Sequence, residues 1–142
     1  MLRIVLDTNV LVASISQKSP FHWVWKALIE GKYQLCITTD ILDEYAEIIE
    51  RYFSVIDAEN TLAQIMLGHN IIQIVRYYEW NAIEQDPDDD KFFDCAVAAN
   101  AHYIVSEDKH FNILKKIPFP MVTRIKTVEF KELMLRQLNF MY

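Results

Sequence analysis

The chain has 142 residues, 52% of them hydrophobic, with only two glycines and four prolines, which excludes an intrinsically disordered protein. A chain of this length can bury a core without disulfides or a structural metal. Charge is uneven: residues 1–108 hold 7 basic and 18 acidic residues (net −11), and residues 109–142 hold 7 basic and 2 acidic residues (net +5).

Short apolar runs alternate with amphipathic segments along the chain. In chain order the pattern predicts a strand at 2–6, helices at 9–15 and 20–30, a strand at 35–38, helices at 41–53 and 57–67, a strand at 70–75, a loop at 76–90, a helix at 91–101, a strand at 103–106, a strand at 121–124 and a helix at 128–138. Gly31 and Gly68 suit helix ends, and Thr39 or Asp40 suits the cap of the third helix.

Strands that alternate with helices from end to end indicate an open, mostly parallel α/β sheet with helices on both faces. No repeat or linker is evident, so we expect residues 1–142 to form one domain. In such sheets a ligand site lies beyond the carboxyl ends of the strands. Two predicted strands stop beside acids at that edge: LRIVL at Asp7, and YIVS two residues before Asp108.

The compartment follows from apolar runs and cysteine usage. No apolar run approaches the roughly 20 residues of a membrane-spanning helix. The N-terminal run is interrupted by Asp7 and Asn9 and shows no small-residue cleavage site. Cys36 and Cys95 have no metal-ligand spacing, so we expect reduced, buried thiols. The sequence therefore predicts a soluble, cytoplasmic protein.

Four acidic residues are expected at the same edge of the sheet. Asp7 follows the first strand, Glu44 lies early in the helix after the second, Asp90 precedes an Ala-rich helix, and Asp108 follows YIVS. Grouped carboxylates repel one another and need compensation, and grouped oxygen ligands are what Mg²⁺ and Mn²⁺ select. These acids therefore predict a divalent metal site for Mg²⁺ or Mn²⁺.

Other acids lie close to Asp90 in sequence. Asp94 lies one helical turn later and is either a further metal ligand or supporting acid, or a solvated helix acid; both interpretations stay open. Asp86, Asp88 and Asp89 are expected to be solvated loop acids. For Asp90 itself, capping of the helix start is the alternative to metal binding.

These residues resemble the PIN-domain family, near its branch of toxins from bacterial toxin–antitoxin pairs. The resemblance runs from about Leu2 to Arg124 and rests on LDTNVLVAS, DILDEYAEII and, most specifically, DPDDDKFFDCAVAANAHYIVSEDKHF. It implies a three-layer α/β/α sandwich with a mostly parallel central sheet. The family's four acidic positions are matched by Asp7, Glu44, Asp90 and Asp108. Asn9 and Ser106 match residues that would fix carboxylates or water by hydrogen bonds.

The resemblance implies an endoribonuclease that uses Mg²⁺ or Mn²⁺ and leaves 5′-phosphate and 3′-hydroxyl ends. Divalent ions can activate water, align the reaction and neutralise charge. Asp7, Asp90 and Asp108 would bind a first ion, and Glu44 would bind metal or orient water. The implied partners are RNA, a small antitoxin protein, and a second copy of the chain in a homodimer.

The acidic balance opposes RNA binding, so metal ions and the basic C-terminal quarter would have to offset the repulsion. His110, the histidine nearest the predicted site, is expected to be a surface or capping residue rather than a catalytic one. The basic residues near it are either phosphate contacts or ordinary solubilising charges, and both interpretations stay open: Lys109, Lys115, Lys116, Arg124 and Lys126.

Two alternatives to the nuclease remain. Asp7 at a strand end could be a phosphorylated nucleophile, but phosphatases of that kind usually carry a second Asp two residues on, where this chain has Asn9. The alternative from another class is a catalytically silent PIN-fold module that binds protein or RNA without cutting it.

Overall fold

The computed structural model describes residues 1–76 and 78–140. Its centre is a five-stranded parallel sheet in the order β3-β2-β1-β4-β5. The strands are β1 (Arg3–Leu6), β2 (Gln34–Ile37), β3 (Ile71–Gln73), β4 (Tyr103–Val105) and β5 (Arg124–Ile125). The parallel sheet predicted from the alternation of elements is confirmed.

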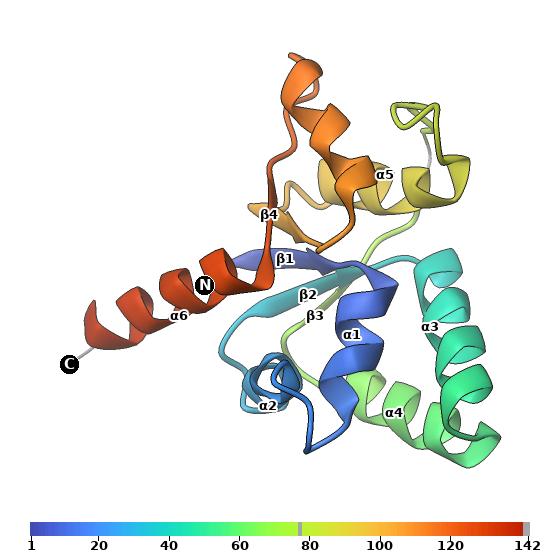
Figure 1. The fold of residues 1–142 in the computed structure, drawn as a ribbon, viewed down its shortest axis with the longest axis vertical. Helices are drawn as coiled ribbons and strands as arrows, with labels where there is room; N and C mark the ends of the chain where they lie inside the picture. Colours follow the sequence, from blue (N-terminus) through green and yellow to red (C-terminus); the bar gives the residue numbers. More distant parts are fainter. Residues whose placement is uncertain (77, 141–142) are drawn as a thin grey trace.

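Helices cover both faces of the sheet. They are α1 (Thr8–Ile15), α2 (His22–Ile29), α3 (Thr39–Tyr52), α4 (Val55–Leu67), α5 (Asp90–Ala98) and α6 (Thr127–Phe140), with short 3₁₀ helices η1 (Pro87–Asp89) and η2 (Lys109–Lys116). Figure 1 shows α1 to α4 on one side of the sheet and α5 on the other. The predicted α/β/α layering is therefore confirmed.

The helix boundaries follow from local chemistry. Helix α3 buries Ile41, Tyr45 and Ile49 along one face, the spacing expected of an amphipathic helix. Its cap is one residue earlier than predicted, because the Thr38 side chain accepts the Ile41 N–H at 3.4 Å. Gly31 follows α2 with a φ of +74°, a conformation that favours glycine, as its predicted role as a helix stop requires.

Two C-terminal elements differ from the prediction. Strand β5 covers only Arg124–Ile125, whereas residues 121–124 were predicted. Helix η2 was not predicted; it buries Phe111 and Leu114, three residues apart, which is one 3₁₀ turn. Its eight residues include only three apolar ones, and a 3₁₀ helix repeats every three residues rather than at the α-helical period of 3.6 residues.

The buried residues form one core around the sheet. Phe130 fixes α6 to the α2 side, with its ring centroid 5.2 Å from that of Trp23 and 5.1 Å from that of Tyr33. Cys36 and Cys95 are free and buried, as expected. None of the helices in residues 1–76 and 78–140 combines the length and apolarity needed to cross a bilayer.

Candidate functional site

Two of the four predicted acids lie at the carboxyl ends of neighbouring strands. Asp7 follows β1 and Asp108 follows β4, and these strands pair in register, Leu6 with Val105. The Asp7 N–H continues the pairing by donating to the Val105 carbonyl at 3.0 Å. Strands β2 and β3 lie on the β1 side of this pair, and β5 lies on the β4 side, so the strand order reverses between β1 and β4. Open α/β sheets bind ligands at such a switch point.

Asp7 is a buried carboxylate that interacts with other acids. Its residue is 5% exposed, and its Oδ2 accepts a hydrogen bond from Ser106 Oγ at 2.8 Å. Burial raises its pKa to about 6; the Ser106 bond opposes this, and the charges of Asp108 and Glu44 add to it. Three of the four predicted acids therefore lie within electrostatic reach of one another.

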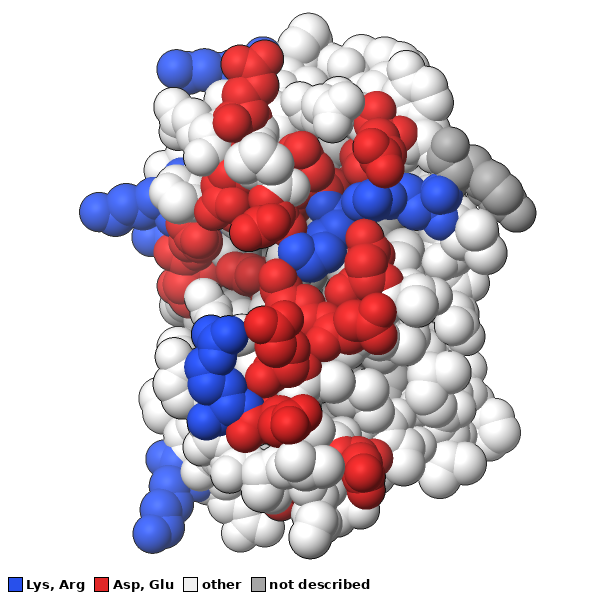
Figure 2. Space-filling model, turned by 90° about the vertical axis from the view of Figure 1, so that its right-hand side faces the viewer, with Lys and Arg blue, Asp and Glu red and all other residues white. Residues whose placement is uncertain are grey.

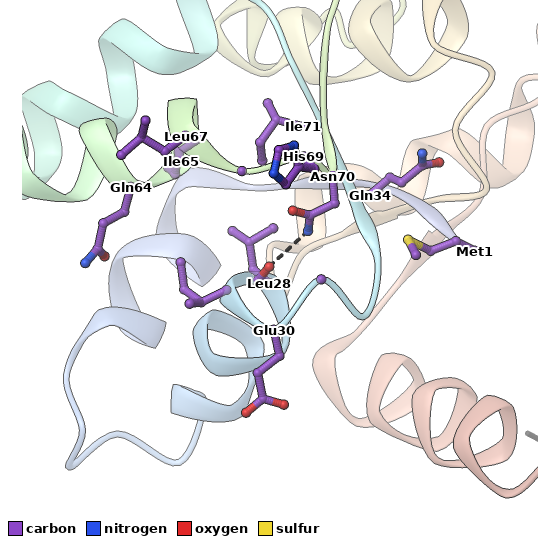
Figure 3. Close-up of a pocket in the computed structure, with 13 residues that line it drawn as sticks. Met1, Leu28, Glu30, Gln34, Gln64, Ile65, Leu67, His69, Asn70 and Ile71 are labelled. Atoms are coloured by element: carbon purple, nitrogen blue, oxygen red, sulfur yellow. Dashed lines mark hydrogen bonds between the residues drawn. The ribbon is translucent and has the colours of Figure 1, made fainter. Parts of the chain in front are cut away.

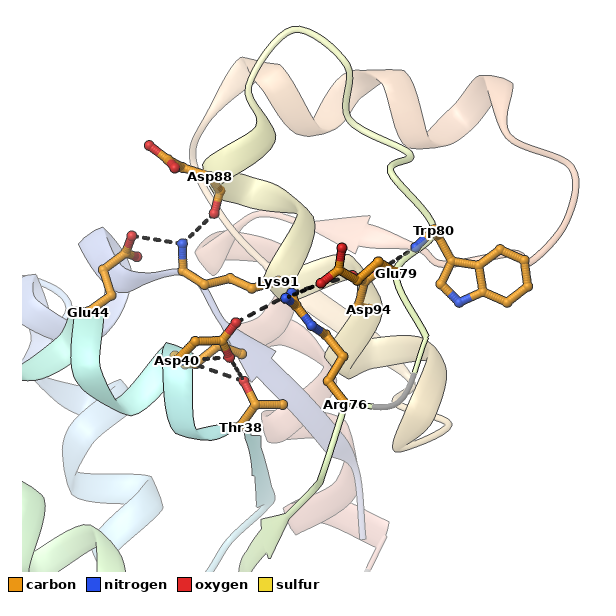
Figure 4. Close-up of polar contacts among 10 residues, drawn as sticks. Thr38, Asp40, Glu44, Arg76, Glu79, Trp80, Asp88, Lys91 and Asp94 are labelled. Atoms are coloured by element: carbon orange, nitrogen blue, oxygen red, sulfur yellow. Dashed lines mark hydrogen bonds and ion pairs between the residues drawn. The ribbon is translucent and has the colours of Figure 1, made fainter.

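Glu44 is held from two sides. One carboxylate oxygen accepts from the Thr8 hydroxyl, and the other lies 2.9 Å from Lys91 Nζ (Figure 4). Neither partner is predicted from the sequence. Thr8 stands directly after the first acid, on the first turn of α1, whereas Asn9, to which the resemblance gave a hydrogen-bonding role, is exposed.

The third predicted acid, Asp90, is the first residue of α5. Asp90 Oδ1 accepts the Ile83 N–H at 2.8 Å and so fixes the preceding loop. Its neighbour Asp89 has a side chain only 13% exposed. Burial first, and then the charges of Asp86, Asp7 and Asp108, raise the pKa of Asp89 to about 7.

The expectation that Asp89 is a solvated loop acid is therefore wrong, while Asp88 is exposed as expected. Asp89 ends the 3₁₀ turn η1 and Asp90 begins α5. Successive residues of a helical segment point about 100° apart, so two adjacent carboxylates have separate partners. The charges of Asp7 and Asp108 act on the carboxylate of Asp89, whereas the Asp90 carboxylate accepts the Ile83 N–H.

Asp108 and His110 complete the acid cluster, whose other members are Asp7, Glu44, Asp86 and Asp89. The Asp108 carboxylate accepts the His110 N–H at 2.9 Å and so caps η2. His110 Nδ1 lies 3.1 Å from Asp86, 3.5 Å from Asp108 and 3.8 Å from Asp89. His110 is half-exposed, as a surface residue should be. With Asp86 and Asp89, however, it offers ligand atoms within 4.8 Å of one another, enough to hold a metal.

These residues fit a divalent cation. Asp89 Oδ2 is buried and, within the described part of the chain, has no hydrogen-bond partner. Asp7 and Asp89 both have pKa values raised toward neutrality by burial and by neighbouring acids. A cation would supply the missing partner and relieve the repulsion, and carboxylate oxygens are ligands that Mg²⁺ and Mn²⁺ accept.

Asp94 contacts a different set of groups (Figure 4). Its side chain is fully buried, accepts the Trp80 N–H at 3.1 Å and lies 3.4 Å from Arg76. Arg76 also lies 3.3 Å from both Asp40 and Glu79. The interpretation of Asp94 as a solvated helix acid is therefore wrong: it anchors the loop before α5. Metal binding by Asp94 stays a prediction.

Glu107, beside Asp108, is directed away from the cluster. Its carboxylate accepts the backbone N–H of Thr127 at 2.8 Å, at the first residue of α6. Glu107 thereby joins the site loop to α6, and a carboxylate suits a helix N-terminus.

The face that carries Glu44 is strongly acidic. Figure 2 shows acidic side chains gathered over it with basic side chains among them. A hollow of about 360 Å³ there is lined by Asp40, Asp43, Glu44, Glu47, Arg76, Pro87, Asp88 and Lys91. This surface suits cations better than a bare phosphate backbone.

A larger hollow, of about 560 Å³, lies at the other end of the strands. Figure 3 shows it between α2, the end of α4 and the start of β3, where Asn70 Nδ2 donates to the Leu28 carbonyl at 2.9 Å. Its lining does not include any residue of the acid cluster. The grouped carboxylates, rather than the volume of a cavity, therefore identify the candidate site.

Comparisons with known proteins identify the family and the fold. A family model described as PIN domain matches residues 3–110. The comparison with curated proteins gives no match.

Two solved structures share the fold over most of their length. VapBC2 from Rickettsia felis, solved with a DNA fragment from their promoter, is 18% identical with a TM-score of 0.61, over 88% of this chain and 98% of that one. VapC20 from Mycobacterium tuberculosis, described as a sarcin-ricin loop cleaving toxin, is 17% identical with a TM-score of 0.57, over 77% of this chain and 92% of that one.

Proposed function

Because this chain belongs to the PIN domain family, we propose that it is an endoribonuclease that depends on Mg²⁺ or Mn²⁺. The observation that carries the proposal is the burial of Asp7 at the end of β1, within electrostatic reach of Asp108 and Glu44. A buried carboxylate among like charges costs free energy, and a cation that binds there offsets that cost.

The chain's own residues have distinct tasks in this proposal. Asp7, Asp89 and Asp108 hold the ion, with Asp89 in the position that the resemblance gave to Asp90. Ser106 orients Asp7 through its 2.8 Å hydrogen bond, and Glu44 faces the same site to orient water. When bound, a divalent ion activates water and neutralises charge on the phosphate and the leaving oxygen.

We further propose that the protein is the toxin of a toxin–antitoxin pair and acts in the cytoplasm. Support comes from the fold shared with VapC20, described as a sarcin-ricin loop cleaving toxin, and with VapBC2. The antitoxin partner and the homodimer implied by the family resemblance belong to this proposal. Co-expression with any small reading frame that adjoins the gene, followed by measurement of the mass of the purified complex, tests both.

Cleavage of RNA by the purified protein tests the proposed activity. With Mn²⁺ or Mg²⁺ present we expect RNA fragments, and excess EDTA should abolish them. Asp7→Asn and Asp89→Asn should each lower the cleavage rate about a hundredfold or more, the scale of losing a preorganised charge at the reacting group. Asp88→Asn, an exposed neighbour, is the matched control and should cleave normally.

The comparison of Asp89→Asn with Asp90→Asn decides between the two candidate ligands. An asparagine at position 90 can still accept the Ile83 N–H, so we expect this variant to keep most of its activity. Loss through Asp90→Asn alone would restore the assignment made from the sequence. Cleavage without metal, or cleavage that survives Asp7→Asn, contradicts the nuclease mechanism. RNA or protein binding without any cleavage would favour the silent binding module.

A further inference from the structure

Lys91 places a cation inside the acid cluster. Its Nζ lies 2.9 Å from Glu44 Oε1, it donates to the Asp88 carbonyl, and its side chain is only 13% exposed (Figure 4). Lys91 belongs to the first turn of α5 and Glu44 to α3, so the ammonium group bridges two helices beside the site. A surface lysine with a free choice of rotamer would remain in solvent.

The two oxygens of Glu44 are both engaged, one by the Thr8 hydroxyl and one by Lys91. The other acids differ. Across residues 1–76 and 78–140, no lysine or arginine forms an ion pair with Asp7, Asp89 or Asp108. One side of the cluster therefore has a lysine of its own, whereas the other side has the imidazole of His110, 3.5 Å from Asp108 and 3.8 Å from Asp89.

A second, half-buried cation of this face, Arg76, does not reach the cluster. It is shared among Asp40, Glu79 and Asp94 and holds the loop before α5. Lys91, in contrast, lies close enough for its charge to oppose the rise in the pKa of Asp89.

We infer that the Lys91 ammonium group occupies the place beside Glu44 that a second divalent ion would take. The protein then binds a single divalent ion, at Asp7, Asp89 and Asp108. This inference rests on the proposed function. An ammonium group carries one compact charge and three N–H donors, and it can therefore bind Glu44 and a phosphate oxygen at once.

The number of Mn²⁺ ions bound, measured by titration calorimetry of the protein without RNA, tests the inference. We expect one ion for the unaltered protein and two for Lys91→Met, with the second ion at least about tenfold tighter than any second ion in the unaltered protein. Lys91→Arg keeps the charge and should return the count to one.

The matched control is Arg51→Met. Arg51 pairs with Glu47 on the same helix as Glu44, at 3.2 Å, but with a side chain 59% exposed. This variant removes one positive charge from α3 and leaves the contacts of Glu44 unchanged. It should therefore bind one ion, as the unaltered protein does. Adding Glu44→Gln to Lys91→Met should remove the second ion, because that ion would lose its ligand.

Glu44→Gln alone also tests the inference, even where Lys91→Met does not fold. It should leave the count at one; loss of that ion would place Glu44 among its ligands and overturn the inference. The same follows if the unaltered protein binds two ions, or if Lys91→Met binds as the unaltered protein does. Absence of any Mn²⁺ binding to the unaltered protein would instead overturn the proposed function.

Discussion

At the scale of single residues, burial and function compete at Asp7. Its side chain has a hydrogen bond from Ser106 but no basic partner among the residues that the structure describes. Burial therefore raises its pKa to about 6, and Asp108 and Glu44 add to the shift. With no cation bound, the buried and ionised Asp7 carboxylate therefore destabilises the native protein at neutral pH.

The metal-free protein should show this cost in its pH dependence. The native state binds the Asp7 proton more tightly than the unfolded chain, whose pKa is near 3.8, so the associated stability is complete below that pH and is lost as pH rises through about 6. In EDTA at pH 8 we expect Asp7→Asn to raise the free energy of unfolding by roughly 2–3 kcal/mol, with a smaller gain toward pH 4.

Urea unfolding at several pH values measures this effect. Glu50→Gln is the control, since Glu50 is an exposed acid on α3, and it should change the free energy of unfolding by less than about 0.5 kcal/mol at every pH. A loss of stability in Asp7→Asn at pH 8 would contradict the account of burial.

At the scale of elements, helix α5 organises the loop in front of it. Asp90 and Asp94, one turn apart, accept the backbone N–H groups of Ile83 and Trp80. Arg76, at the start of the loop, ties the same helix to Asp40 on α3. Side chains of α5 therefore help to hold the loop that leads into Asp89, together with the 3₁₀ helix η1.

Arg76→Met should destabilise this arrangement. Asp94 is fully buried, so removal of its cationic partner leaves an uncompensated charge, and we expect the free energy of unfolding to fall by about 3 kcal/mol at pH 8. Burial raises the pKa of Asp94, so at lower pH the carboxyl can take up a proton and the loss should shrink.

Arg51→Met is the matched control in urea unfolding, because its pair with Glu47 is exposed on both sides. Such surface pairs contribute about 0–1 kcal/mol. Equal losses in the two variants would show that Arg76 is an ordinary surface cation.

At the scale of the whole molecule, the net charge of −6 and the acidic face shape the response to cations. Monovalent salt screens the repulsion between all exposed acids. A divalent ion bound at one site stabilises only the folded state, because the unfolded chain lacks the site. The two effects can be separated at matched ionic strength.

Mn²⁺ should therefore raise the unfolding temperature above its value in NaCl of equal ionic strength. At a hundredfold excess over its Kd the gain corresponds to about 2.7 kcal/mol. Thermal unfolding followed by circular dichroism measures it, and Asp7→Asn should lose the difference. If Mn²⁺ and matched NaCl act alike on the unaltered protein, the cluster holds no specific ion.

The sequence alone was sufficient to predict the alternation of strands and helices, the parallel sheet and the edge that carries the acids. These features depend on local periodicity and on where strands stop, so they are encoded in neighbouring residues. Helix η2 and the short β5 were missed or misplaced because their pairing and burial depend on contacts with distant segments.

Only the tertiary structure decided which side chains meet. The run of acids before α5 does not distinguish Asp89, which interacts with Asp7 and Asp108, from Asp90, which holds Ile83, because a small rotation along a helical turn directs adjacent carboxylates to different partners. The contact between Lys91 and Glu44 joins two helices far apart in the chain. Such pairs arise from packing, since their geometry is set by the sheet between them rather than by sequence spacing.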